Sequence, residues 1–198
     1  GVGHAVTRSV RDSAAILDAT HGPAPGDPYQ VAPPVRPFSE EVGADPGRLR
    51  VALMTTTFDG AAVDAECVAA AEGAAKLCAD LGHEVEVAAP TFDVEALVWA
   101  MDVIIAANIR NVVGASLASL GRKQRQGDVE TITALWVEKA NEFSSADYAR
   151  ALVVIHAVGR RLGEFFLDFD VALSPPLADP PLPLGASDQM GDDLQAFN

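Results

Sequence analysis

Basic residues are scarce in this chain. Lysine and arginine together number 14 against 28 aspartates and glutamates, which gives a formal net charge of −14 over 198 residues. A surface this acidic repels phosphate backbones and anionic lipid headgroups, so nucleic acids and membranes are poor candidates as partners. The lysines are Lys76, Lys123 and Lys139, and the surrounding pattern places each on an exposed face or in a basic loop. We therefore expect none to be desolvated enough to act as a general base.

Long apolar runs and cysteines are also few. No stretch approaches the roughly 20 uninterrupted apolar residues that a membrane span needs, and Arg8, Arg11 and Asp12 interrupt any signal-peptide core. Cys67 and Cys78 lie in one predicted helix. Its rise of ~1.5 Å per residue separates them by roughly 16 Å, which is too far for a disulfide. We expect a soluble cytoplasmic protein with reduced thiols.

The composition that remains is typical of a packed domain. Apolar residues make up 49% of the chain, and the mean hydropathy is +0.16. Disorder is therefore not expected. A chain of this length can hold one domain with a sizeable core but not comfortably two. We expect a single domain over residues 1–198.

A strand–helix–strand pattern between residues 49 and 89 is the clearest fold signal. Residues 49–55 read as a buried strand, Asp64 is placed to cap a helix that ends near Leu81, and residues 83–89 alternate like a second strand. Two strands joined through one helix imply a right-handed crossover and parallel pairing. The fold class is therefore predicted to be α/β.

Further helices are predicted on both sides of this pattern. Thr7 or Ser9 is expected to cap a first helix that ends before Gly22. Residues 23–47, which are rich in proline, are expected to be extended. Later helices are expected over residues 93–119, 129–142 and 145–168, and a short strand follows at residues 171–173. We expect the last helix to bury the face that carries Leu152 and His156.

Activated nucleophiles and cofactor motifs are hard to find. The histidines at positions 4, 21, 83 and 156 show no metal-ligand spacing, and Ser144 and Ser145 are best explained as a helix cap. The loop after the first strand has one glycine, Gly60, and places Asp59 and Asp64 where a phosphate would sit. Nucleotide binding is therefore not expected.

Three segments carry a family pattern over nearly the whole chain. They are residues 4–29 with their Arg-Ser-Val-Arg-Asp core, residues 63–90 after the stretch PGRLRVAL, and residues 143–185. In this order and at this spacing the chain resembles the amidase-signature family. Its overall style is similar to bacterial amidases of the 6-aminohexanoate cyclic dimer hydrolase type.

The resemblance implies the central to C-terminal portion of a three-layer α/β/α fold around a mixed sheet. It also implies hydrolysis of C–N bonds by a Ser–cis-Ser–Lys triad, without a metal or an organic cofactor. The Gly-Gly-Ser-Ser-Gly-Gly-Ser stretch that carries the serines does not occur in the 198 residues. No catalytic residue is therefore assigned, and this chain alone is expected to be inactive.

The same resemblance assigns a wall of the substrate pocket. In such enzymes the helical stretch after the strand–helix–strand unit shapes the acyl-side pocket, so Met101 and Trp136 are expected to border the substrate cavity. The competing interpretation is that both are packing residues of the core. The expected partners are a small-molecule amide substrate, the missing segments of the same enzyme, or a second copy in a homodimer.

Two other functions stay open at this point. The chain could be a truncated, non-catalytic remnant or binding domain with the same fold. It could also belong to a tRNA-dependent amidotransferase subunit. The strong acidity argues against the second alternative, although a partner subunit can supply the basic surface that tRNA requires.

Overall fold

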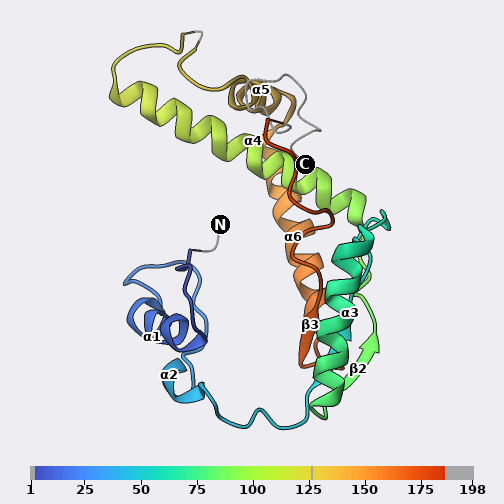
Figure 1. The fold of residues 1–198 in the computed structure, drawn as a ribbon. Helices are drawn as coiled ribbons and strands as arrows, with labels where there is room; N and C mark the ends of the chain where they lie inside the picture. Colours follow the sequence, from blue (N-terminus) through green and yellow to red (C-terminus); the bar gives the residue numbers. More distant parts are fainter. Residues whose placement is uncertain (1–2, 126, 186–198) are drawn as a thin grey trace. The chain divides into compact units, whose positions relative to one another are not determined.

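The computed structural model describes residues 3–125 and 127–185. Contacts within the chain divide it into two compact units, one formed by residues 1–47 and one that begins at Arg48. Figure 1 shows the first unit in blue and the second in the colours from cyan to red. The single domain expected for residues 1–198 stays a prediction.

The N-terminal unit contains helices α1 (Val10–Thr20) and α2 (Phe38–Glu41). The Ser9 hydroxyl caps α1 by accepting from the Asp12 N–H at 3.1 Å, as predicted. The Asp18 carboxylate accepts from the N–H groups of Ser39 and Phe38. The Ser39 side chain lowers the pKa of Asp18 most, and these two backbone bonds lower it further. Because Asp18 satisfies the free donors of a helix start, α2 forms inside a segment that was expected to be extended.

A parallel sheet organises the second unit. Its elements are β1 (Arg50–Leu53), α3 (Ala65–Asp80), β2 (Glu84–Val87) and β3 (Val171–Leu173). The strand order is β2-β1-β3, and β1 pairs in parallel with both neighbours. Asp64 caps α3 as predicted, with its carboxylate accepting from the Glu66 N–H. The α/β class and the parallel crossover are confirmed, whereas residues 3–125 and 127–185 contain no antiparallel partner that would make the sheet mixed.

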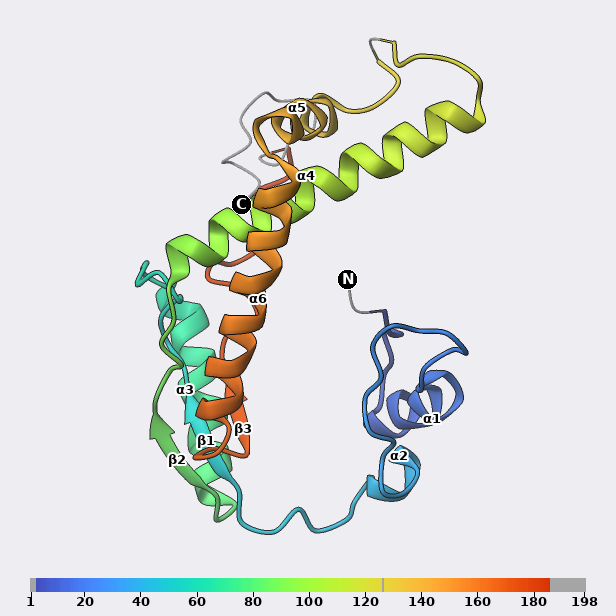
Figure 2. The same cartoon turned by 180° about the vertical axis from the view of Figure 1, so that it is seen from behind.

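A helical layer connects β2 to β3. It consists of α4 (Val94–Ser119), α5 (Thr131–Lys139), the 3-10 turn η1 (Ala140–Glu142) and α6 (Ser145–Phe165). Helix α6 crosses α4 and returns to the sheet, as Figures 1 and 2 show. The contact is made by Ala100 and Val103 of α4 and Ala151 of α6, which form one buried cluster. Small side chains at this crossing let the two backbones approach closely.

Helix α3 packs against one face of the sheet. Leu53 of β1 is buried with Ala71 and Ala75 of α3, and Val85 and Leu173 pack against the same cluster. In both views α3 lies on one side of the sheet and α6 on the other. The two crossovers therefore run on opposite sides of the sheet.

The buried face of α6 differs from the predicted one. Ala151 is fully buried, with Val154 and Ile155 packed against its cluster, whereas Leu152 and His156 are exposed. The prediction followed the periodicity of the larger apolar side chains. The crossing instead selects the face with an alanine at its centre, because only a small residue fits between two helices in close contact.

Helix α4 is long and apolar enough to cross a membrane by length and composition alone, and no other helix among the described residues passes that test. Two of its charged side chains are bonded to the segment that follows α4. Asp102 pairs with Lys139 of α5, and Arg110 donates to the Asn141 side chain at 2.7 Å. Helices α5 and α6 both pack along it.

Arg50 at the start of β1 and Asp170, directly before β3, join the starts of these two neighbouring strands. The Arg50 N–H donates to Asp170 Oδ2 at 2.8 Å, and the Asp170 N–H donates to the Arg50 carbonyl at 2.9 Å. The guanidinium adds a bond from Nη2 to Asp170 Oδ1 at 3.1 Å. These hydrogen bonds to Arg50 lower the pKa of Asp170 and raise that of Arg50. They fix the register of β3 on β1.

We expect the cap of α6 to be specific to one serine. Ser144 and Asp147 form a capping box, in which the Ser144 hydroxyl accepts from the Asp147 N–H at 3.2 Å. Ser144→Ala should lower the free energy of unfolding by about 1 kcal/mol in urea denaturation. Ser145→Ala is the matched control and should be nearly neutral, because Ser145 lies inside the helix. Equal losses in both variants would contradict the assignment.

The Arg50–Asp170 pair should make stability depend on pH in acid. The pKa of Asp170 is held below its ordinary value of 3.8, so its ionised form stabilises the fold above that pH. This contribution is lost as the pH falls through the lowered pKa. Asp170→Asn should lower Tm by a few degrees at neutral pH, with the difference shrinking below about pH 4. Asp80→Asn, at an exposed i,i+4 pair with Lys76, is the control and should change Tm little.

Candidate functional site

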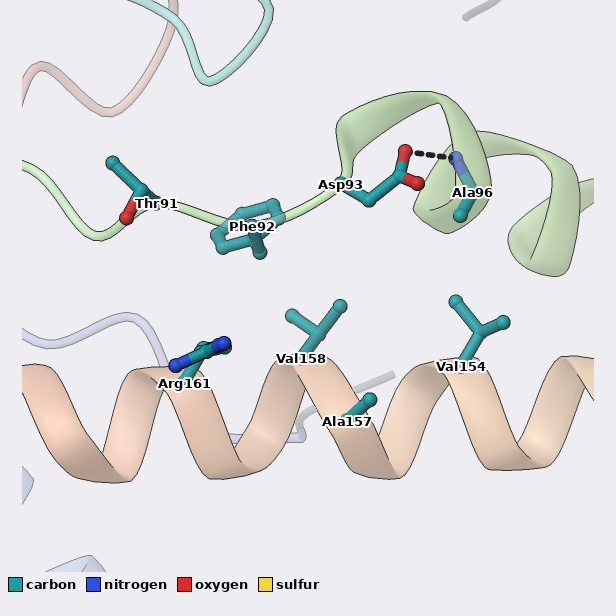
Figure 3. Close-up of a pocket in the computed structure, with 8 residues that line it drawn as sticks. All are labelled: Thr91, Phe92, Asp93, Ala96, Val154, Ala157, Val158 and Arg161. Carbon is teal, nitrogen blue, oxygen red and sulfur yellow. Dashed lines mark hydrogen bonds between the residues drawn. The ribbon is translucent and has the colours of Figure 1, made fainter.

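A groove of about 630 Å³ lies between the start of α4 and the middle of α6. Figure 3 shows the loop that leads from β2 into α4 on one side and helix α6 on the other. The loop follows the carboxyl end of β2. In open α/β sheets, ligands bind outside the carboxyl ends of the strands. This edge of the sheet is therefore the candidate substrate-binding site.

The walls of the groove are mainly apolar. Val154 and Val158 of α6 point toward Phe92 and Ala96 across the hollow (Figure 3). The Phe92 ring packs at 5.1 Å from the ring of Phe58, which lies in the loop after β1. This aromatic contact joins the loops that follow β1 and β2 and supports Phe92 from behind the groove wall.

The charged groups of the groove are already engaged. The Asp93 carboxylate accepts from the Ala96 N–H at 2.9 Å and caps α4, and Arg161 pairs with Glu164 at 2.8 Å. The carboxylate of Asp93 is therefore used as a helix cap, and Arg161 lies at the other end of the groove (Figure 3). This arrangement favours an uncharged ligand with apolar parts over a phosphate or a metal ion.

The loop after β1 is closed by its own side chains. The Thr57 hydroxyl and the Ala61 N–H both donate to Asp59, and these bonds lower the pKa of Asp59, the Thr57 bond most. The carboxylate thus holds the loop in shape and stays ionised. An anion would be repelled there, in agreement with the expectation that the loop does not bind nucleotide phosphates.

Cys67 has the wrong electrostatic surroundings for a nucleophile. Partial burial raises the pKa of its thiol, and the nearby carboxylates of Asp64, Asp179 and Glu66 raise it further. A reactive cysteine needs the opposite environment, one that favours the thiolate. Cys67 and Cys78 are both free, as predicted. Cys67 is therefore a structural thiol of α3.

Histidines and serines are placed in structural or solvent-facing positions. His83 accepts from the Leu49 N–H at 3.2 Å through Nδ1, which ties the start of β2 to the segment before β1. His4 lies 2.7 Å from the Ser13 hydroxyl, a contact that the sequence did not reveal. Ser13 lies inside α1, where its N–H is bonded to the Ser9 carbonyl and is not available to an oxyanion. This pair lacks the donors that acyl transfer requires.

The two residues expected to border the substrate cavity lie in different environments. Met101 is on α4 with 46% of its surface exposed, whereas Trp136 of α5 is only 6% exposed. Trp136 belongs to a core cluster with Ala106 and Ile132. Neither residue lines the groove of Figure 3. Their role as pocket walls stays a prediction, and Trp136 already packs as a core residue within this unit.

Lys139 is not on an exposed face, and this prediction was wrong. Its side chain is 24% exposed, and Nζ lies 2.6 Å from Asp102 Oδ2. The same ammonium lies 5.0 Å from the centre of the Trp136 ring. Two signals in the sequence could have indicated this pair: Asp102 interrupts an apolar helix, and Lys139 follows Trp136 by one helical turn.

Comparisons with known proteins add a family assignment. A family model described as Amidase matches residues 4–198. A 6-aminohexanoate-cyclic-dimer hydrolase of a Pseudomonas strain is 36% identical over 152 residues, which are 72% of this chain and 29% of that protein. The chain therefore spans less than a third of the length of that relative.

Two solved structures are similar to the fold. A 6-aminohexanoate cyclic dimer hydrolase, also solved in complex with substrate, matches with a TM-score of 0.73 at 32% identity over 82% of this chain and 34% of that one. A bacterial aryl acylamidase of the amidase signature family matches with a TM-score of 0.70 at 20% identity, over 84% of this chain and 35% of that one. The second match supports the fold alone.

Truncation of the two predicted wall residues should have unequal effects on stability. Trp136→Ala removes a buried indole and should lower the free energy of unfolding by about 3–5 kcal/mol. Met101→Ala should lower it by less than about 1 kcal/mol, because the side chain is half-exposed. Urea unfolding of the two variants measures both. A small loss for Trp136→Ala would contradict its place in the core.

Proposed function

Because the chain belongs to the amidase family, we propose that it is part of an enzyme that hydrolyses amide C–N bonds with a Ser–cis-Ser–Lys triad. Its 198 residues supply scaffold and substrate-pocket walls, and the triad is supplied by other segments of the enzyme. The observation that carries this proposal is the family match over residues 4–198. The 0.73 TM-score with the cyclic dimer hydrolase supports it.

In the complete enzyme the parallel sheet becomes part of a larger mixed sheet in three layers. The exposure of its outer strands supports this step. Val87 on β2 is 74% exposed and Val171 on β3 is 40% exposed, although valine in a parallel strand is normally covered on both faces. Further strands and helices would cover these residues and satisfy the open strand edges.

The substrate is a small amide with apolar parts, hydrolysed in the cytoplasm. The relative of similar structure is named for its action on the cyclic dimer of 6-aminohexanoate and has been solved with substrate bound. The apolar walls of the groove in Figure 3 suit methylene groups, and its engaged charges suit a neutral amide. Met101 and Trp136 form another part of the acyl-side wall.

The first test compares this chain with the complete protein. The intact mass under denaturing conditions establishes whether a purified sample exceeds the 20.7 kDa of the 198 residues. The longer protein should release amine from linear and cyclic amides, and the 198 residues alone should not. Hydrolysis by the 198 residues would disprove the placement of the triad. Inactivity of the complete protein toward every amide would favour a non-catalytic remnant.

Met101→Ala tests the pocket wall in the complete enzyme. Loss of the thioether side chain should change the ratio of kcat/KM between amides with short and long acyl chains by about tenfold or more, since one methylene in an apolar pocket is worth roughly 10- to 200-fold. Val112→Ala, an exposed apolar position farther along α4, is the matched control and should leave the ratio unchanged. An unchanged ratio in Met101→Ala would contradict the wall assignment.

A further inference from the structure

The Lys139–Asp102 ion pair differs from the exposed lysine pair of the same chain. Its two side chains are 24% and 21% exposed, at an Nζ–Oδ2 distance of 2.6 Å. The Lys76–Asp80 pair has nearly the same distance, 2.7 Å, but its side chains are 75% and 62% exposed. The same two residue types thus form a surface pair in α3 and a partly buried pair between α4 and α5.

Partial burial gives the Lys139–Asp102 pair a geometric role. The free-energy penalty of removing two charges from water offsets much of their electrostatic attraction. Such a pair therefore adds little net stability. Its two partners are nevertheless expected to stay together, because a partly buried charge without its partner loses hydration and gains nothing in return. The pair joins residues 37 positions apart in sequence. It therefore selects one position of α5 along α4.

The pair lies beside both residues of the proposed pocket wall. Asp102 follows Met101 directly on α4. On α5, Lys139 is one turn after Trp136, and its ammonium lies 5.0 Å from the centre of that ring, in cation–π range. A shift of α5 that breaks the ion pair would also move Trp136 relative to Met101.

We propose that Lys139 and Asp102 are positioning residues that set the spacing of the acyl-side wall and so the acyl-chain preference of the amidase. This inference rests on the proposed function. Neither residue touches the reacting atoms in this role. They act through Trp136, by holding α5 in the position at which the wall fits its substrate.

The test is a substrate profile of the complete enzyme. Lys139→Met keeps the length of the side chain but removes the charge, and Asp102→Asn keeps its shape. Both should raise KM for the preferred amide by about three- to tenfold with kcat nearly unchanged, the size expected for coupled neighbours. Lys139→Arg keeps the positive charge, so its KM should stay close to that of the parent enzyme. Lys76→Met is the matched control and should have the parent KM.

Exchanging the two charges distinguishes a specific role in positioning α5 from a general loss of stability. The double variant Lys139→Asp with Asp102→Lys rebuilds the pair in reverse and should recover KM relative to either single change. A fall in Tm with no change of KM in Lys139→Met would overturn the proposal. If Met101→Ala changes the acyl-chain ratio while Lys139→Met does not, the positioning role fails and the pocket wall stands. If neither changes it although amides are hydrolysed, the wall itself fails.

Discussion

Parallel pairing of the central strand β1 with both neighbours determines the rest of the larger unit. Parallel neighbours cannot be joined by a tight turn, so each connection must leave the sheet and return through a crossover. The connection to β2 is a single helix, α3. The connection to β3 contains α4, α5 and α6, and it closes where Asp170 binds Arg50. The helices α4, α5 and α6 thus lie in one connection, and both of its ends are fixed because β2 and β3 pair with the same strand, β1.

Local signals predicted most elements of this fold. Caps at Ser9, Asp64 and Ser144 mark helix starts, because a side-chain acceptor next to an apolar period is a local feature. The contact face of α6 was predicted wrongly, since close approach at Ala151 depends on the surface of α4 rather than on α6 itself. The short helix α2 was missed for a similar reason. Its capping carboxylate, Asp18, lies 20 residues earlier in the chain.

The candidate site was less accessible to sequence reasoning than the fold. Met101 and Trp136 were expected from the family resemblance, and the structure shows that their helices are linked by Lys139 and Asp102. The groove beside Phe92 joins a strand end to the middle of α6, a proximity that no local pattern encodes. The amidase assignment itself followed from three separated segments, and the family match over residues 4–198 confirms it.

The crossing of α4 and α6 also has a mechanical consequence. Beyond its contact with Ala151, α4 continues from Val103 to Ser119, a distance of about 24 Å at ~1.5 Å per residue. The crossing at Ala100 and Ala151 is the point about which α4 would turn relative to α6, and α5 would move with it because it packs on Ala106. A rotation of α4 by only about 5° at this crossing would displace its C-terminal end by roughly 2 Å. One methyl group added at Ala100 or Ala151 would therefore displace the backbone near Leu120, although the added atoms do not reach that far.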